Sequence, residues 1–296
     1  MKNINHPIGN IKIFIIKKTA EFIKATILNI LSLLINIKKN QSEIIISRAL
    51  FAPWKEDKDF EQIQKKICDL TLLDNYRLYT LWYLSKSLSL ENGNIFDIGC
   101  MKGGAGLLMA KANIKGNTYL FDTFSGFMEE EIYHKKKHFI YTGLNEVKKN
   151  ASMFGLKKVK VIKCIFPNNL PRSLKNKKIK LCHIDVNTYK STKKAFYFVD
   201  KRMGKNGIII FDDYGIFGTD SIKKFIKEIK KNYSKKYIFL YNFMGQCILI
   251  KKKLNYFLSL STNFFLAIHG IIALSLVPTF STGCSASFSL VFKKFF

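Results

Sequence analysis

Three aspartates follow two apolar runs in the second half of this 296-residue chain, and together they could bind a metal ion. Asp185 ends the run that contains His183, and the pair Asp212 and Asp213 comes directly after a later run. We predict that the two runs are neighbouring parallel strands, roughly 4.8 Å apart, whose carboxyl ends meet at one edge of a sheet. Carboxylates this close repel one another, and a divalent cation that prefers oxygen ligands, such as Mg²⁺, removes the repulsion. Asp185, Asp212 and Asp213 are therefore the predicted metal ligands.

Other interpretations of these residues stay open. Asp212 or Asp213 could cap the following helix, which would leave Asp185 as a lone substrate-binding carboxylate. His183 and Asp185 are two positions apart, so in a strand their side chains leave the same face, and either could take a proton from a bound substrate. We predict Asp185 as the catalytic base ahead of His183, because a histidine at the end of a strand is more often a structural hydrogen-bonding group.

Residues 97–106 predict a ligand-binding turn between a strand and a helix. Glycines such as Gly99, Gly103 and Gly104 let the backbone turn sharply and approach a ligand, and the helix N-terminus offers free N–H groups. The spacing differs from the G-x-G-x-x-G fingerprint, so a ligand without a dinucleotide pyrophosphate is expected. A tight connection that binds nothing is the alternative.

Asp122 stands 25 residues after Asp97, at the end of the next apolar run. A nucleoside site in an α/β sheet places a carboxylate there, where it accepts hydrogen bonds from both ribose hydroxyls. Asp97 is predicted to orient the amino-acid end of the same ligand through the loop backbone or a water molecule. For Asp97, a helix-capping or turn role is the alternative.

The elements that must position these residues are short apolar runs that alternate with helical patterns from about residue 94, which predicts a parallel sheet covered by helices. The predicted strands are 94–99, 118–122, 158–164, 179–185, 207–212, 237–241 and 246–251. The predicted helices are 105–111, 144–154, 191–203 and 222–231, and two more patterns within 59–88 break near residues 74–75. Only residues 242–245 separate the last two strands, so we expect an antiparallel hairpin at one edge of the sheet.

Three regions divide the chain. Residues 53–253 form the predicted globular domain, with a helical lead-in over 53–90 and a sheet domain over 91–253. Residues 1–52 are predicted as an amphipathic helical segment, because charged residues interrupt its apolar run and no signal-peptide cleavage site follows. Residues 254–296 form an apolar extension, in which 256–280 lack charge and are long enough to span a bilayer. A membrane anchor and a soluble extension are both open for this segment.

The chain carries 49 basic and 21 acidic residues, a net charge of +28, which excludes an acidic solvating protein and brings nucleic acid or an anionic membrane into consideration. Only four of the basic residues are arginines, the residue that phosphates and base edges usually recruit. The lysines are dispersed, so a compositional origin is favoured over a basic patch, and no specific nucleic-acid partner is expected. The six cysteines show neither zinc-site nor disulfide spacing, which indicates a reducing compartment.

Several of these motifs, in this order, resemble the macrocin O-methyltransferase family of class I S-adenosylmethionine-dependent, metal-dependent enzymes, which methylate sugar hydroxyls. The resemblance covers about residues 53–252. Its parts are 53–54, 57–60, 71–79, 97–106, 121–127, 183–192, 207–215 and 245–246. It implies an α/β, Rossmann-like class I methyltransferase fold, with a seven-stranded, mostly parallel sheet, one antiparallel edge strand and helices on both faces.

The resemblance also implies roles for single residues. In that family the glycine loop holds the methionine part of S-adenosylmethionine and the aspartate after the second strand binds the ribose. The cofactor residues implied here are Asp97, Gly99, Gly103, Gly104, Asp122, Thr123 and Phe124, and the aspartates at Asp185, Asp212 and Asp213 are similar to metal ligands. Two positions depart from the pattern. Asn187 stands where many relatives have a carboxylate, which predicts a weaker metal site, and Asp97 stands where relatives often have glutamate.

The expected activity is methyl transfer from S-adenosylmethionine to a hydroxyl of a sugar or glycosylated small molecule, assisted by Mg²⁺ or a similar cation. A small phenol or a lipid-linked glycan stays open as the acceptor. The alternatives are an RNA methyltransferase, suggested by the net charge, and a membrane-tethered, non-catalytic binding protein on the same scaffold. We expect a cytoplasmic protein, free or attached to the cytoplasmic face of the membrane through the C-terminal segment. Homo-oligomerisation is left open.

Overall fold

The computed structural model describes residues 51–127, 140, 143–216 and 218–252, together with residues 18, 19, 22, 23, 26, 27 and 30. The chain divides into two units, residues 1–50 with 274–296, and residues 51–273. In the first unit the described residues are helical and exposed. Within the described residues, no helix is both long enough and apolar enough to cross a membrane. The predicted extension 254–296 lies outside the described part of the chain.

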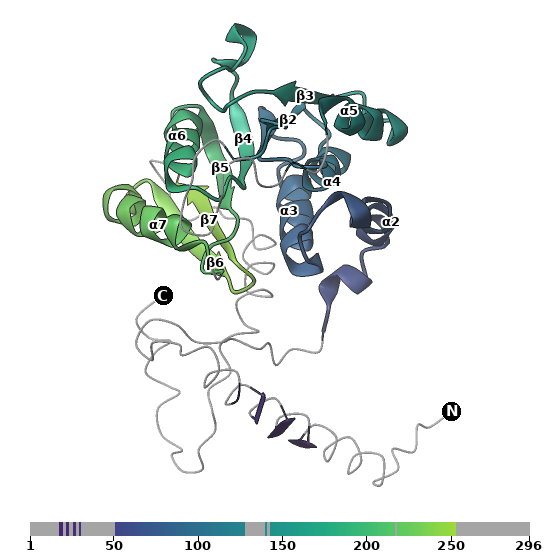
Figure 1. Cartoon of the computed structure of the whole chain (residues 1–296), viewed down its shortest axis with the longest axis vertical. Helices are drawn as coiled ribbons and strands as arrows, with labels where there is room; N and C mark the ends of the chain where they lie inside the picture. Colours follow the sequence, from purple (N-terminus) through teal and green to yellow (C-terminus); the bar gives the residue numbers. More distant parts are fainter. Residues whose placement is uncertain are drawn as a thin grey trace. The chain divides into compact units, whose positions relative to one another are not determined.

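Seven strands form one sheet in the second unit, in the order β3-β2-β1-β4-β5-β7-β6 (Figure 1). The strands from β3 to β5 pair in parallel. The inner strands β2, β1, β4 and β5 are mostly buried because helices cover both faces of a parallel sheet, whereas the edge strand β3 carries exposed lysines. All seven predicted strands are confirmed: β1 (Asn94–Ile98), β2 (Thr118–Asp122), β3 (Val159–Lys163), β4 (Ile179–Ile184), β5 (Met203–Phe211), β6 (Tyr237–Asn242) and β7 (Gln246–Lys251).

The predicted hairpin of β6 and β7 is confirmed at one edge of the sheet. β7 lies between β5 and β6 and is antiparallel to both. The single reversed strand is therefore the one next to the edge, and β6 is the edge strand itself. Gly245, in the turn of the hairpin, has a φ of +99°, which a glycine adopts without steric cost.

One predicted boundary is wrong. Met203, expected at the end of a helix, is the first residue of β5, and the helix α6 (Tyr189–Asp200) ends three residues before it. Met203 pairs with Ile179 of β4. This pairing joins residues 24 positions apart, and it overrides the helical period of the sequence because strand formation depends on neighbouring strands.

Helices cover both faces of the sheet (Figure 1). α6 and α7 (Asp220–Tyr233) pack on one face, and α4 (Gly104–Ala112) packs on the other together with the lead-in helices α2 (Lys58–Ile67) and α3 (Asn75–Ser87). α5 (Leu144–Met153) follows β2 along the chain and packs beside Leu120 through Val147. The core is thus two apolar layers, one on each side of the strands.

Aspartates start both lead-in helices. Asp57 caps α2 by accepting a hydrogen bond from the Phe60 N–H at 3.0 Å, and its other oxygen accepts from the Trp82 indole N–H at 2.9 Å. Asp74 caps α3 by accepting from the Arg77 N–H at 3.0 Å. These caps confirm the predicted break near residues 74–75, and they fix where α3 begins.

Three polar side chains interrupt the apolar face of the sheet beneath α3. The three are Asp97 on β1, His183 on β4 and Asp212 directly after β5. Each stands two positions after a buried apolar residue of the layer that packs against α3. All three are at most 2% exposed. Asp97 and His183 are in register on neighbouring strands. A buried polar row therefore crosses the sheet at its carboxyl edge.

Candidate active site

A cavity of about 250 Å³ lies where β1, β2 and β4 end. Its wall brings together the glycine loop after β1 and the acidic segments after β4 and β5. Among the predicted site residues, the cavity is lined by Gly99, Asp122, Thr123, His183, Asp185 and Asp213. Asp97, Gly103, Gly104, Phe124 and Asp212 are not part of its wall.

Asp122 organises the loops at one end of the cavity. One carboxylate oxygen accepts a hydrogen bond from the Met101 N–H at 2.8 Å, and the other accepts from the Phe124 N–H at 2.8 Å. Burial raises the pKa of Asp122, and these two backbone hydrogen bonds oppose the rise. Each oxygen of a carboxylate can accept two hydrogen bonds, so Asp122 can also bind a pair of ligand hydroxyls. Phe124 shapes this end through its backbone N–H.

Gly99 permits the close approach of β1 to β4. Its φ is +90°, and a Cβ added there would lie 1.9 Å from the backbone oxygen of Asp185. Gly103 and Gly104 stand behind the cavity wall, where a Cβ would meet Val147 and Leu70 respectively. The glycines of this loop are therefore explained by packing within the fold. Gly99 also borders the cavity, and Gly103 and Gly104 do not.

Asp97 does not reach the cavity, in contrast to its predicted role at the amino-acid end of a ligand. The side chain is fully buried, and Oδ1 lies 2.8 Å from Nδ1 of His183. Among the described residues, Oδ2 has no hydrogen-bond partner, and it faces Gly106, where an added Cβ would lie 2.6 Å away. Asp97 acts in this structure as the partner of a buried histidine.

His183 bridges two aspartates. Nδ1 lies 2.8 Å from Asp97 and Nε2 lies 3.1 Å from Asp212. Burial by itself would lower the pKa of His183, but the hydrogen bonds with Asp212 and Asp97 raise it to about 10. An imidazolium that donates from both nitrogens cannot accept a proton. Asp185 ahead of His183 as the base stays a prediction.

Arg77 is a site residue that the sequence motifs do not identify on their own. It reaches from α3 to the ends of the strands, where Nη1 lies 2.9 Å from Asp212 Oδ1 and 3.3 Å from Asp213 Oδ1. Nε lies 2.9 Å from the carboxylate of Asp74, the residue that caps α3. Two signals were available: Arg77 lies in segment 71–79 of the family resemblance, and arginine, whose planar guanidinium suits several carboxylates at once, is rare in this lysine-rich chain.

The acidic cluster is unevenly compensated. Burial would raise the pKa of Asp212, but the hydrogen bond and charge of His183, with the charge of Arg77, hold it below its usual range. Burial and the charge of Asp212 raise the pKa of Asp213. Burial and the charges of Asp212 and Asp213 raise the pKa of Asp185 well above its usual value. The described cluster therefore holds more carboxylates than cations, and Asp213 shares the Arg77 guanidinium with Asp212.

Asn187 links these two carboxylates. Its side-chain amide lies 2.7 Å from Asp213 Oδ2 and 3.1 Å from Asp185 Oδ1, and the nitrogen donates to both when the amide is oriented with its NH₂ toward the acids. Asn187 and Asp213 both have positive φ values, +56° and +57°. Strained backbone of this kind persists where the fold holds a functional geometry.

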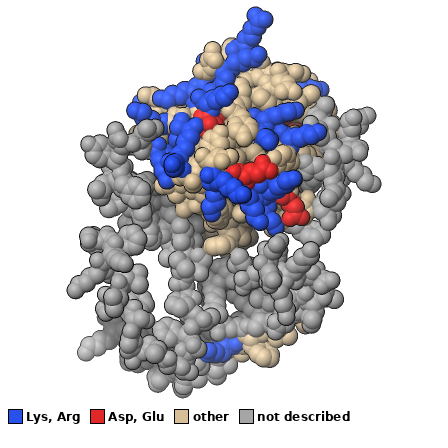
Figure 2. Space-filling model, turned by 90° about the vertical axis from the view of Figure 1, so that its left-hand side faces the viewer, with Lys and Arg blue, Asp and Glu red and all other residues tan. Residues whose placement is uncertain are grey.

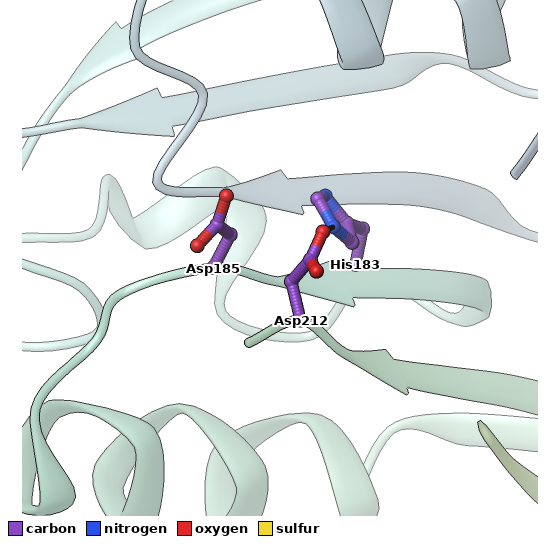
Figure 3. A group of neighbouring side chains, drawn as sticks. All are labelled: His183, Asp185 and Asp212. Atoms are coloured by element: carbon purple, nitrogen blue, oxygen red, sulfur yellow. Dashed lines mark hydrogen bonds and ion pairs between the residues drawn. The ribbon is translucent and has the colours of Figure 1, made fainter. Parts of the chain in front are cut away.

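The residues fit a hard divalent cation. Ligand atoms of His183, Asp185 and Asp212 lie within 4.8 Å of one another (Figure 3). Asp185 and Asp213 face the cavity and share an excess of negative charge, and one or two carboxylates with water suffice for Mg²⁺. Asp212 would join them as the third predicted ligand only by releasing Arg77 or His183.

Comparisons with known proteins identify the family and the fold of the chain. The family profile described as Macrocin-O-methyltransferase (TylF) matches residues 23–236. The solved structure of the O-methyltransferase NovP superposes with a TM-score of 0.55 at 16% identity, over 62% of this chain and 83% of that one. The calicheamicin methyltransferase CalS11 gives a TM-score of 0.48 at 14% identity, over 72% and 99% of the two chains. None of the curated protein sequences matches the chain. The similarity to NovP shows a shared fold.

Proposed function

The chain belongs to the macrocin O-methyltransferase (TylF) family and is an S-adenosylmethionine-dependent O-methyltransferase, and we propose that it methylates a hydroxyl of a sugar or glycosylated small molecule with the help of a divalent cation. The observation that carries the proposal is the joint position of Asp122, Asp185 and Asp213 on one cavity wall. This arrangement puts a nucleoside-binding carboxylate and an acidic, under-neutralised pair within one enclosed space.

The cofactor end of the cavity lies around Asp122. Asp122 binds the two ribose hydroxyls, while Gly99, Met101 and Thr123 complete that wall. When bound, S-adenosylmethionine supplies an electrophilic methyl group on a sulfonium centre. Asp97, Gly103 and Gly104 support the site from behind, because they hold His183 and the packing of the glycine loop.

The acceptor end of the cavity lies around Asp185 and Asp213. These two carboxylates, with Asp212 as a further ligand, would hold the cation. When bound, a divalent cation lowers the pKa of an acceptor hydroxyl and orients it. The amide of Asn187 lies between Asp185 and Asp213, so it holds them in place without adding a third negative charge.

Asp185 takes the hydroxyl proton at a carboxylate oxygen. It lines the cavity in which the acceptor would bind, and a carboxylate oxygen there is a suitable proton acceptor. His183 stays protonated between Asp97 and Asp212 and holds the strand ends in register. Arg77 positions Asp212 and Asp213 and is a positioning residue in this scheme.

Thermal unfolding of the full chain tests the cofactor assignment. S-adenosylhomocysteine at 100 times its Kd adds about 2.7 kcal/mol of stability, which raises Tm by roughly 5 to 10 °C for a domain of this size. NADH serves as the control and should leave Tm unchanged. A shift with NADH alone would overturn the cofactor assignment.

Methyl transfer from labelled S-adenosylmethionine to a panel of sugars and glycosylated small molecules tests the metal and the base. We expect activity to be lost in EDTA and restored by Mg²⁺. Asp185→Asn keeps the shape of the side chain and should lower kcat at least 100-fold without changing the Kd of S-adenosylhomocysteine. Full activity in EDTA would refute metal assistance, and native kcat in Asp185→Asn would refute its role as base.

A further inference from the structure

Charge is divided unevenly over the catalytic domain. Residues 51–127 carry nine basic and nine acidic side chains, whereas residues 143–252 carry 26 basic and seven acidic ones. Of those seven acids, three belong to the active site and Asp200 is buried. A bias of composition toward lysine acts on both halves alike, so the compositional origin favoured from the sequence does not explain this difference.

Part of the excess lies on α6 and α7, which pack side by side and together carry eight basic and three acidic side chains. Phe196 and Tyr197 of α6 contact Phe225 of α7, with ring centroids 5.6 and 6.5 Å apart, so the two helices form one face of the domain. Figure 2 shows this side, where lysine and arginine side chains gather and acidic ones are few. We name it the α6–α7 basic face, and its exposed lysines are Lys190, Lys194, Lys201, Lys224, Lys227, Lys230, Lys231 and Lys235.

The acidic residues of these two helices do not balance the lysines. Asp220 and Glu228 are the exposed acids of α6 and α7. Glu228 accepts a hydrogen bond from the Tyr189 hydroxyl at 2.5 Å, and Asp220 pairs with Lys223 at 3.5 Å. Six of the eight exposed lysines belong to the helices themselves, so the face keeps a net positive charge of several units.

We propose that the α6–α7 basic face is a docking surface for an anionic phospholipid bilayer. Lysine side chains are long, flexible point charges, and each one near an acidic membrane strengthens binding roughly fivefold. Neither α6 nor α7 contains an arginine, the residue that forms bidentate contacts with nucleic-acid phosphates. Tyr197, at 39%, is the one large apolar or aromatic side chain exposed on these two described helices, which leaves no platform for stacked bases.

Docking through this face leaves the active site accessible. The cavity lies at the carboxyl edge of the sheet, and none of the eight exposed lysines lines it. Membrane docking is thus a property separate from methyl transfer, and it goes beyond the proposed function. Its dependence on charge also separates it from any apolar contact made elsewhere in the chain.

Flotation of the full chain with vesicles tests the proposal. Vesicles of phosphatidylcholine with 30 mol% phosphatidylglycerol are compared with pure phosphatidylcholine, in roughly 0.1 M and 0.5 M NaCl. We expect binding to the anionic vesicles at low salt and its loss at high salt. The triple variant Lys224→Gln, Lys227→Gln, Lys231→Gln should bind about 100-fold more weakly, since it removes three charges from the face.

The control removes three charges from the other side of the sheet. Lys58→Gln, Lys65→Gln, Lys66→Gln changes exposed lysines of α2, and glutamine has a helix propensity close to that of lysine, so both triple variants should keep the native Tm. We expect native vesicle binding from this control. An equal loss in both variants would show that only net charge matters and would overturn the proposal.

Two further outcomes also overturn it. Binding to neutral vesicles that is indifferent to salt and to the α7 lysines would place membrane contact elsewhere in the chain. Tighter binding to a single-stranded RNA oligomer than to the anionic vesicles, lost in the α7 variant, would assign the face to nucleic acid.

Discussion

Replacing Arg77 by lysine keeps a positive charge at the active site but removes the planar fork that reaches three carboxylates. In the native structure Nη1 lies 2.9 Å from Asp212 and 3.3 Å from Asp213, and Nε lies 2.9 Å from Asp74. One ammonium cannot hold these partners together. We expect Asp213 to lose its fixed position and kcat of methyl transfer to fall about 10- to 100-fold, as displacements near 1 Å do in active sites.

The effect on stability follows from the same contacts. The side chains of Arg77 and Asp212 are 14% and 0% exposed, so this pair is desolvated, whereas Asp74 is 38% exposed and its ion pair contributes little. A hydrogen bond to a charged group contributes about 1.5 to 3 kcal/mol, and lysine keeps part of it. We expect the free energy of unfolding to fall by about 1 to 3 kcal/mol, which lowers Tm by roughly 3 to 10 °C and leaves the protein folded at 25 °C.

Rates at saturating substrate are compared at 25 °C with the Kd of S-adenosylhomocysteine. That Kd should be unchanged, because the hydrogen bonds that hold Asp122 come from the Met101 and Phe124 N–H groups and do not involve Arg77. Arg202→Lys is the matched control: its guanidinium lies 3.6 Å from the centroid of the Phe198 ring, away from the cavity, so some stability is lost while kcat stays native. Native kcat in Arg77→Lys, or equal losses in kcat and cofactor affinity, would refute the positioning role.

Two further predictions concern stability. Gly99→Ala should lower the free energy of unfolding by about 3 to 5 kcal/mol, since φ is +90° and the added Cβ would lie 1.9 Å from Asp185 O. Gly143→Ala is the control: its Cβ would meet no described atom within 4 Å, so the free energy of unfolding should change by about 0.5 kcal/mol at most. Similar denaturation curves for the two variants would contradict this reasoning. Burial lowers the pKa of Lys180 from 10.5 to about 8, so between these pH values the unfolded chain binds more protons than the folded one. The native protein should therefore gain stability relative to Lys180→Met as pH rises from 8. The expected gain is up to about 2 kcal/mol near pH 9.5. Urea unfolding of both proteins at pH 7.5 and 9.5 measures this. A pH-independent difference would mean that the carbonyls of Ser89, Glu91 and Lys115, which accept from the Lys180 ammonium, replace its lost hydration.

Much of the fold could be predicted from the sequence, because the information is local. A strand buried on both faces is a continuous apolar run, which marks the central strands, and the edge strands β3 and β6 are marked by their β-branched and aromatic residues. The hairpin is local information as well, because only residues 242–245 separate the last two strands. The aspartates at the strand ends also follow locally: a polar residue that ends an apolar run marks the edge of the sheet where ligands bind.

The composition of the site depends instead on how elements pack. Arg77 meets Asp212 across 135 positions of sequence, and this contact exists only because α3, started by the Asp74 cap, crosses the strand ends at one particular register. The partnership of Asp97 with His183 likewise requires β1 and β4 to be neighbours, although 86 residues separate them.

The same distinction explains which predicted roles changed. Residue type and spacing determined that the chain has a glycine loop and an acidic cluster, because both are properties of short segments. Only the tertiary structure decided that Gly103 and Gly104 make room for Val147 and Leu70, and that Asp97 is directed into the protein. A side chain's charge and size are written in the sequence, but its partner is set by long-range packing, which brings distant segments into contact.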